Sequence, residues 1–318
     1  MSDVKIAVLG ECMLEISLAS ATSAGSSLPA NLAFGGDVLN TAVYLSRLGC
    51  PVDFVTAVGD DKMSYWLLNQ WQQEGVGCAQ VQRIPDHAPG MYLISTDATG
   101  ERSFSYWRDQ SPARKLFNDS GRAEQIFDQL MRYPWLYLTG ISLAILPPEA
   151  RSRLLRFLEH YRAAGGKVAF DSNYRPRLWG DKADAVRAFE QIYRQVDVAL
   201  LTLEDEQALF GNGGLQQHQQ RLLDYGIPEL VIKQGPEGAS IIAGELNTIV
   251  PAQRVRPVDT TSAGDSFNAG YLAERIGGKD PVASAKTAHR LAALVIQHRG
   301  AIIPRRLMAG FDRPEMTG

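Results

Sequence analysis

The sequence predicts an α/β protein with a mostly parallel sheet and helices on both of its faces. Short apolar runs, typical of strands buried on both faces, recur along the chain. Amphipathic segments of helix length lie between these runs, and strands that alternate with helices form mostly parallel sheets. The predicted strands are residues 4–10, 52–58, 135–138, 167–170, 196–201 and 230–232.

The predicted helices have clear ends. Residues 37–48 and 62–74 are amphipathic and are followed by Gly49 and Gly75, and glycine suits the left-handed residue that closes many helices. A proline pair at 147–148 opens a further helix that runs to about residue 164, since proline is tolerated in a first helical turn. We expect a single α/β domain over residues 1–318.

Two segments do not follow this alternation. Residues 15–34 are rich in small and turn residues and lack a helical period, whereas Met91–Thr96 and Arg102–Trp107 flank a turn at 97–100 and predict a β-hairpin. We expect a small second sheet from about residues 12–34 and 89–110. A sheet of this size cannot bury both faces alone, so it should cover a cleft, pair with a second copy of the chain in a homo-oligomer, or do both.

The composition excludes several classes of protein. Of the 318 residues, 45% are hydrophobic and 21% charged, which is typical of globular proteins. The net charge of −3 gives no basic footprint, so nucleic acid and membrane surfaces are not expected partners. Three cysteines without paired spacing indicate neither a disulfide framework nor a zinc site, and together with the absence of a signal peptide they favour the cytoplasm.

The most informative stretch is residues 259–270, DTTSAGDSFNAG. Ser262, Ala263 and Gly264 are small and precede Asp265, and helix-forming residues follow. Small residues let backbone amides converge on an anion at a helix N-terminus. Asp265 could there remove a proton from a substrate hydroxyl during phosphoryl transfer. The alternative is that Asp265 is only an N-terminal helix residue.

This stretch resembles the C-terminal signature of the ribokinase-like (PfkB) carbohydrate kinases. Residues 35–42, GGDVLNTA, with Gly49 and 59–61, resemble the N-terminal signature of the same family, and the likeness runs from residue 5 to about 306. The resemblance implies a three-layer α/β/α fold with a small β-sheet lid. It also implies that ATP, with Mg²⁺, phosphorylates a sugar hydroxyl.

A finer resemblance concerns the substrate. Residues 10–13, 100–108, 139–142, 171–179 and 295–305 look like those of the family's sugar-acid kinases. That likeness implies phosphorylation of 2-keto-3-deoxygluconate at its terminal hydroxyl, which gives the 6-phosphate. A fructokinase or another neutral-sugar kinase of the family is the alternative.

The resemblance assigns a role to each matching residue. Asp265 is the expected base, with the amides of 262–265, chiefly Ala263 and Gly264, as the anion hole. The expected substrate-binding residues are Gly35, Gly36, Asp37, Asn40, Tyr92, Tyr106, Arg108 and Arg175. The expected nucleotide-binding residues are Asn173, Lys233, Gly235, Gly238 and Ser262. Glu206 matches a glutamate that helps to organise magnesium, although Leu203 replaces the usual asparagine.

Competing interpretations can be weighed on single residues. Tyr92 alternates with apolar neighbours, so it fits a packing role as well as a ligand contact. A nicotinamide-dependent oxidoreductase would need G-x-G-x-x-G after the first strand, which the sequence lacks. A sugar-binding regulator without catalysis would be expected to lose Asp265 or the small residues before it. Arg108 and Arg175 favour an acidic sugar over a neutral one.

Overall fold

The computed structural model of the protein describes residues 5–18, 28–96 and 102–311. Within these residues the main sheet has the strand order β13-β12-β11-β10-β9-β8-β1-β4-β5. The strands from β11 to β5 run parallel, as predicted for all of them except β5, which was not predicted. β12 runs antiparallel to its neighbours β11 and β13, and neither β12 nor β13 was predicted. The strands are β1 (Ile6–Leu9), β4 (Val52–Val58), β5 (Val81–Arg83), β8 (Trp135–Thr139), β9 (Lys167–Asp171), β10 (Val198–Thr202), β11 (Glu229–Lys233), β12 (Ala239–Ala243) and β13 (Leu246–Val250).

The helices that pack on the main sheet begin and end where local chemistry allows. At the start of α2 the Asp61 side chain accepts hydrogen bonds from the amides of Met63 and Ser64. The helix closes before Gly75, whose φ of 77° is the left-handed conformation that glycine adopts at little cost. The helices are α1 (Asp37–Arg47), α2 (Lys62–Gln73), α3 (Ser120–Leu130), α4 (Gly140–Ala144), α5 (Pro148–Ala163), α6 (Lys182–Tyr193), α7 (Leu203–Phe210), α8 (Leu215–Leu223), α9 (Ala263–Ile276) and α10 (Pro281–Val295).

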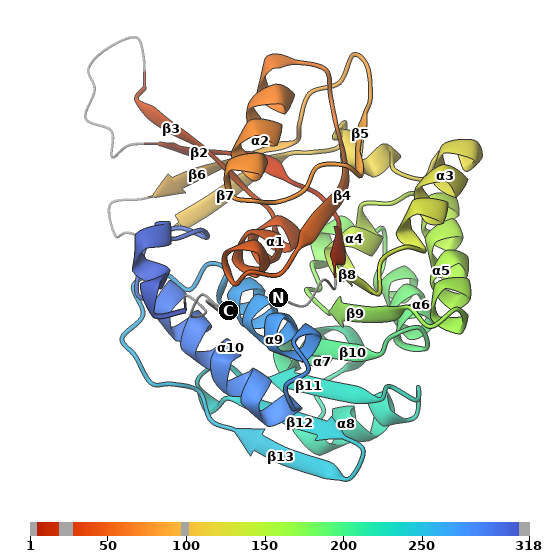
Figure 1. Ribbon diagram of the computed structural model, residues 1–318, viewed down its shortest axis with the longest axis vertical. Coiled ribbons are helices and arrows are strands. Elements are labelled where there is room, and N and C mark those ends of the chain that lie inside the picture. The colour runs from red at the N-terminus through yellow and green to blue at the C-terminus, as the bar shows by residue number, and fades with distance from the viewer. Residues whose placement is uncertain (1–4, 19–27, 97–101, 312–318) are drawn as a thin grey trace, which may run out of the picture.

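Two hydrophobic cores lie on opposite faces of the main sheet. Side chains alternate along each strand, so Val8 belongs to the core under α1, α2, α9 and α10, and its neighbour Ala7 to the core under α3, α5 and α6. Figure 1 shows these two helix layers on either side of the strands. The three-layer α/β/α architecture is therefore confirmed.

A second sheet, here called the lid, lies beside α2 at one end of the molecule (Figure 1). Its strand order is β3-β2-β6-β7, from β3 (Ala30–Gly35), β2 (Met13–Leu18), β6 (Met91–Thr96) and β7 (Arg102–Trp107). β2 pairs antiparallel with β3 and parallel with β6, which joins the two chain segments expected to form it. The small separate sheet is confirmed, while the predicted turn at 97–100 lies outside the described residues.

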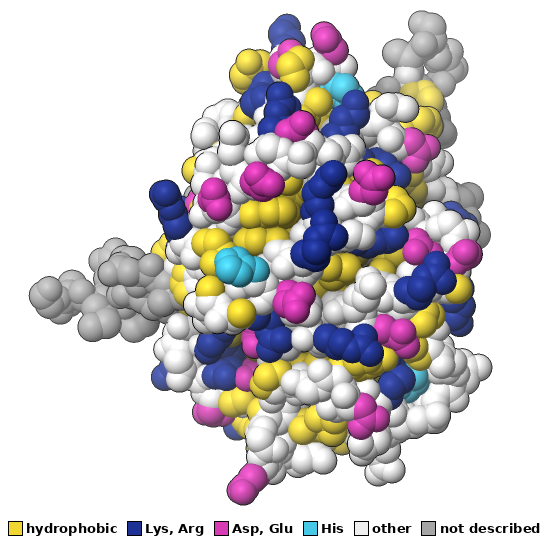
Figure 2. Space-filling model, turned by 90° about the vertical axis from the view of Figure 1, so that its right-hand side faces the viewer, with side chains coloured by type: hydrophobic (Ala, Val, Ile, Leu, Met, Phe, Trp, Pro, Cys, Tyr) yellow, Lys and Arg dark blue, Asp and Glu magenta, His cyan; other side chains and the backbone are white. Residues whose placement is uncertain are grey.

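The surface gives no sign of a basic footprint on the face that carries α3 and α5. Figure 2 shows basic and acidic side chains interspersed there, with apolar side chains in small groups between them. None of the helices in the described ranges combines the length and the apolar character needed to cross a membrane.

Candidate functional site

The candidate site lies at the carboxyl ends of the parallel strands of the main sheet. Because these strands are parallel, the residues that follow them share one edge, where ligands of open α/β sheets bind. Glu11 follows β1, Thr139 ends β8, Asp171 ends β9 and Lys233 ends β11. The N-termini of α1 and α9 reach the same edge through the hydrogen bonds described below.

Asp265 lies in the first turn of α9, where sequence analysis expected it. Its Oδ2 accepts a hydrogen bond of 2.8 Å from Asn40 Nδ2, so the two signature stretches meet in space. Burial raises the pKa of Asp265 to about 7, and the nearby Asp37 carboxylate contributes to the rise, partly offset by the Asn40 hydrogen bond. A carboxyl group with such a pKa can act as a base near neutral pH.

The helix start beside Asp265 carries free backbone donors. Ser262 precedes α9 in the left-handed conformation, with φ of 64°. The Ala263 amide already donates to the Thr260 carbonyl oxygen at 3.2 Å, so it is less available to a ligand than the sequence suggested. The amides of Gly264 and Asp265 have no acceptor within the helix, as is usual for a first turn. These two amides are therefore the best placed to bind an anion.

Asp37, at the start of α1, is hydrogen-bonded to one residue that ends β8 and to one that follows β9. Its Oδ2 accepts hydrogen bonds from Thr139 Oγ1 at 2.6 Å and from Asn173 Nδ2 at 2.7 Å, and its pKa is raised by burial. Asn173 has a φ of 28°, a conformation rare for residues other than glycine. Asn173, an expected nucleotide-binding residue, thus donates a hydrogen bond to Asp37, an expected substrate-binding residue.

The paired glycines before α1 are required by contacts within the protein. A Cβ at Gly35 would collide with the Tyr92 hydroxyl, and a Cβ at Gly36 would collide with the carbonyl oxygen of Glu11. The two glycines thus let the lid and the residue after β1 approach the start of α1 closely. Their contact with a substrate stays a prediction.

The predicted lid residues each have a protein partner. The Tyr92 hydroxyl donates to Glu15, and its ring lies 5.8 Å from the ring of Tyr106, which is half exposed. Arg108 is buried and forms an ion pair with Glu11. Tyr92 is therefore a packed residue whose hydroxyl donates to a protein carboxylate, and its contact with a substrate stays a prediction. Glu11 and Glu15 received no role from the sequence, although the position of Glu11 after a predicted strand could have identified it.

The acidic residue of α7 that lies at the site is Asp205 and not Glu206. Asp205 Oδ2 accepts a hydrogen bond of 2.9 Å from Ser172, and Asp205 Oδ1 lies 3.9 Å from Arg175 Nη1. The Arg175 side chain is 56% exposed, and it also donates to the Tyr174 carbonyl oxygen. Asp205 is thus an acidic group of the site. Sequence analysis assigned the following residue, Glu206, instead.

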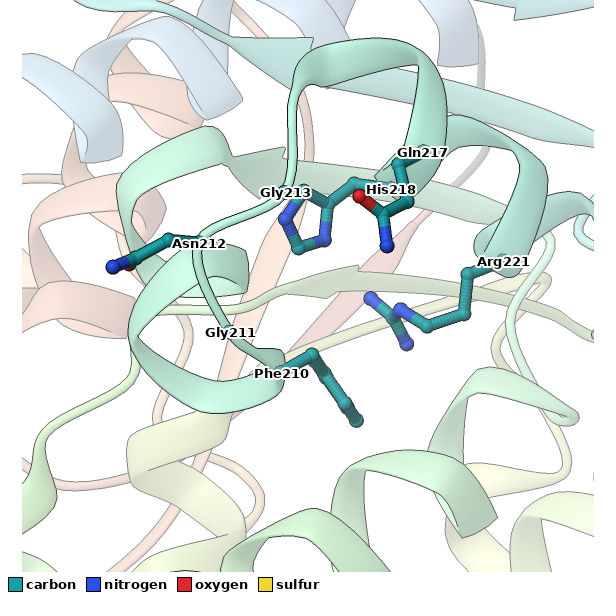
Figure 3. Close-up of a pocket in the computed structure, with 7 residues that line it drawn as sticks. All are labelled: Phe210, Gly211, Asn212, Gly213, Gln217, His218 and Arg221. Atoms are coloured by element: carbon teal, nitrogen blue, oxygen red, sulfur yellow. The ribbon is translucent and has the colours of Figure 1, made fainter.

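Glu206 lies on the far side of α7. It is fully buried, and its two carboxylate oxygens accept hydrogen bonds from Tyr193 and Arg221. Figure 3 shows Arg221 in a separate pocket of about 210 Å³ formed by α8 and the loop after α7. The assignment of Glu206 to magnesium is therefore corrected, because its oxygens are engaged away from the site.

The loop after β11 turns at two glycines with positive φ. Gly235 and Gly238 have φ of 54° and 108°, and a Cβ at Gly238 would collide with the Val250 carbonyl oxygen. Lys233, by contrast, points inward. Its Nζ donates to Asp171 Oδ1 at 3.1 Å and to Asn268 Oδ1 at 3.0 Å.

A three-layer fold with a β lid and a partly buried aspartate in the first turn of a helix is the arrangement expected of a carbohydrate kinase. The chain belongs to the pfkB family of carbohydrate kinases, whose family model matches residues 3–307. It is 45% identical over 312 residues to the 2-dehydro-3-deoxygluconokinase of Escherichia coli (strain K12), covering 96% of this chain and 98% of that protein. The 2-dehydro-3-deoxygluconokinase of Dickeya dadantii (strain 3937) is also 45% identical, over 316 residues, 97% of this chain and 99% of that protein.

The fold is shared with solved structures of the family. The crystal structure of aminoimidazole riboside kinase from Salmonella enterica, complexed with aminoimidazole riboside and an ATP analogue, matches with a TM-score of 0.79. The match covers 96% of this chain and 99% of that one at 22% identity. The family resemblance and the ribokinase-like fold are therefore confirmed.

Proposed function

We propose that this kinase transfers the terminal phosphoryl group of ATP to the terminal hydroxyl of 2-keto-3-deoxygluconate, also called 2-dehydro-3-deoxygluconate. The observation that carries this proposal is the placement of Asp265, a partly buried carboxyl that is hydrogen-bonded by Asn40 and has a pKa of about 7, beside two amides that have no acceptor within α9. The name shared by relatives that are 45% identical supports the substrate.

The reaction follows from the groups in the first turn of α9. Asp265 accepts the proton of the attacking hydroxyl, and the hydroxyl oxygen forms the new bond to the terminal phosphorus of ATP. The bond from that phosphorus to the bridging oxygen breaks, and ADP leaves with the electron pair. The amides of Gly264 and Asp265 donate to the transferred phosphoryl, where negative charge is met by the positive end of the helix dipole.

The residues present suit ATP bound with Mg²⁺. No group of three or more His, Cys, Asp or Glu side chains in the described ranges is arranged to hold a metal ion by protein ligands alone. Mg²⁺ needs no such group, because it commonly binds through substrate phosphates, water and one or two carboxylates, and it neutralises phosphate charge in the transfer step. Asp205, whose carboxylate lies beside Ser172 and Arg175, is the carboxylate that we assign to this role. Gly235 and Gly238 shape the loop expected beside the nucleotide.

The unsatisfied groups of the site suit a polyhydroxylated acid. Asn40 Oδ1 and Glu11 Oε1 are buried acceptors that make no hydrogen bond within the described part of the chain. Such acceptors are costly to bury unless a ligand or water donates to them, and sugar hydroxyls are donors. Arg108 and Arg175 supply guanidinium groups for the carboxylate at the other end of the substrate. Gly35, Gly36 and Asp37 complete the sugar side of the site.

The lid suits contact with a second copy of the chain. Large apolar side chains are exposed on it, with exposed fractions of 46% for Leu32 and 56% for Trp107. Phe104 and Tyr106 are exposed on the opposite lid face. We expect one face to close over the substrate and the other to pair in a homodimer, because a four-stranded sheet cannot bury both faces alone.

The test is a substrate panel with purified protein, ATP and Mg²⁺. ADP release should be fastest with 2-keto-3-deoxygluconate, and nuclear magnetic resonance of the product should place the phosphate on C6. Fructose, as the neutral-sugar alternative, should react with a much lower kcat/KM. A preference for fructose would show that the enzyme is a neutral-sugar kinase.

A further inference from the structure

Four buried polar side chains meet between α9 and the main sheet. Asn268 of α9 donates to Asp171 Oδ2 at 2.9 Å and to the Tyr137 hydroxyl at 3.0 Å, and its Oδ1 accepts from Lys233. Lys233 also donates to Asp171. These four residues, here called the polar quartet, come from β8, β9, β11 and α9, and each is less than a tenth exposed.

The quartet fixes the position of the Lys233 ammonium group. Asn268 uses its oxygen and both amide hydrogens within the quartet, so its side chain has one defined orientation. Asn268 also lies three residues after Asp265, which is close to one helical turn. The same hydrogen bonds therefore hold both the ammonium group and the catalytic end of α9 against the strand ends.

Among the described residues Lys233 has partners for two of its three donors, and the anion hole lies next to the third. An ammonium group carries three N–H donors, of which Asp171 and Asn268 engage two. Lys233 Nζ lies 3.6 Å from the point where a Cβ at Gly264 would stand, and Gly264 contributes one of the free amides. The ammonium group is thus in contact distance of the first turn of α9.

The negative charges around the site favour a cation at the position of this ammonium group. Asp171 is buried and Asp37 and Asp265 are partly buried, so three carboxyl groups lie at one strand edge, and an arriving phosphoryl group brings further negative charge. Arg175 is 56% exposed, so water screens its charge. The buried Lys233 is not screened in this way, and a buried charge acts more strongly over the same distance.

We propose that Lys233 forms one wall of the anion hole and stabilises the phosphoryl group during its transfer, while Asp171 and Asn268 hold it there. This inference rests on the proposed function and assigns Lys233 to the reacting phosphoryl and not to general nucleotide affinity. A contact made mainly in the transition state changes kcat, whereas a contact to the α- or β-phosphate changes the affinity for ADP.

The experiment compares Lys233→Met with the wild-type enzyme in the full chain. We expect kcat to fall by about 100- to 1000-fold, as for the loss of one oxyanion donor. The Kd for ADP, measured by calorimetry, should stay within about twofold, because ADP lacks the transferred phosphoryl. Lys167→Met is the matched control, since Lys167 is exposed at the opposite end of β9, and it should leave kcat unchanged.

A second variant separates the catalytic role from the cost of an unpaired carboxylate. Lys233→Met leaves Asp171 buried without its ion pair, whereas the double variant Lys233→Met/Asp171→Asn removes both charges. The double variant should recover thermal stability but not kcat. Lys233→Arg, which keeps the charge, should retain more activity than Lys233→Met.

Two results would overturn the inference. One is a loss of ADP affinity in Lys233→Met as large as the loss of kcat, which would make Lys233 an ordinary nucleotide contact. The other is recovery of kcat in the double variant, which would make the role purely structural. Either result leaves the proposed function intact, because that function is tested by the substrate preference of the wild-type enzyme.

Discussion

Asn40 Nδ2 donates a hydrogen bond of 2.8 Å to Asp265 Oδ2, although the two residues lie 225 positions apart in the chain. This bond joins the N-terminus of α9 to α1, which begins at Asp37. Asn40 thereby orients the carboxyl group expected to act as the base, and its own Oδ1 remains without a partner in the described residues. One asparagine can therefore position the base with one atom and bind a substrate hydroxyl with the other.

Replacing the base tests the centre of the proposal. Asp265→Asn keeps the shape of the side chain but cannot accept the proton, so kcat should fall by about 10²–10⁴. ADP should still bind and the melting temperature should not fall, because Asn can keep the contact to Asn40 through its carbonyl oxygen. Steady-state kinetics and calorimetry measure both. A variant with most of its turnover would exclude Asp265 as the base.

The raised pKa of Asp265 predicts a pH dependence of activity. The base works only when ionised, so kcat/KM should fall about tenfold per pH unit below a pKa near 7. A pH–rate profile of the wild-type enzyme measures this acid limb. A rate that stayed constant down to pH 5 would contradict it.

The same pKa shift predicts a dependence of stability on pH. The folded Asp265 holds its proton at pH values where the unfolded chain has lost it, so its contribution to stability is present below about pH 4 and is lost as pH rises through about 7. Asp265→Asn removes the desolvated charge and should therefore raise the melting temperature at pH 8 but change it little at pH 4. Calorimetric scans of both proteins without ligands test this, and an equal shift at both pH values would argue against it.

Whether the sequence predicts a strand depends on how many side chains of that strand are buried. The strand β4 is buried at every position and is apolar except at Asp53 and Thr56, and its predicted bounds, 52–58, are those observed. In β13, buried and exposed side chains alternate, with Asn247 and Thr248 among five residues, so the segment has no apolar run to mark it. An edge strand exposed to water needs little hydrophobicity, and its sequence is then close to that of a loop.

Sequence analysis predicts a site residue when the function of that residue requires a local structure that the sequence also indicates. Asp265 needs a helix start and small neighbours, and these are visible in the sequence. The choice between Asp205 and Glu206 is not visible, because neighbouring helix residues point about 100° apart and only the sheet decides which one faces the site. The pairing of Arg108 with Glu11 is likewise absent from local sequence, since 97 residues separate them.

Arg108 provides the test of acid recognition. A charge-assisted hydrogen bond contributes about 1.5–3 kcal/mol, so Arg108→Ala should raise KM for 2-keto-3-deoxygluconate by roughly 10- to 100-fold. The slower reaction with fructose should change little. Because Arg108→Ala leaves Glu11 buried and unpaired, the double variant Glu11→Gln/Arg108→Ala should be measured as well, with Arg122→Ala as a surface control. Equal losses with both sugars would refute acid recognition by Arg108.

The last prediction concerns the outer face of the lid. Trp107 pairs with Met91 across the strands, whereas Tyr106 pairs with Tyr92, so Trp107 lies on the face opposite the two tyrosines. Leu32 lies on the same face as Trp107, because Phe34, two residues further along β3, pairs through β2 with Met91. These exposed apolar side chains should be buried in a homodimer, since water contact with a large apolar patch is unfavourable.

The double variant Leu32→Asp/Trp107→Asp should therefore convert a dimer into a monomer in sedimentation velocity experiments. Ile249→Asp is the matched control, because Ile249 is 57% exposed on β13, away from the lid, and its variant should remain dimeric. The monomeric variant should also show faster hydrogen exchange in Met91–Thr96, because one face of the strand loses its cover. A wild-type protein that is monomeric at micromolar concentration would rule out the lid-mediated dimer and leave the lid with the single task of covering the substrate.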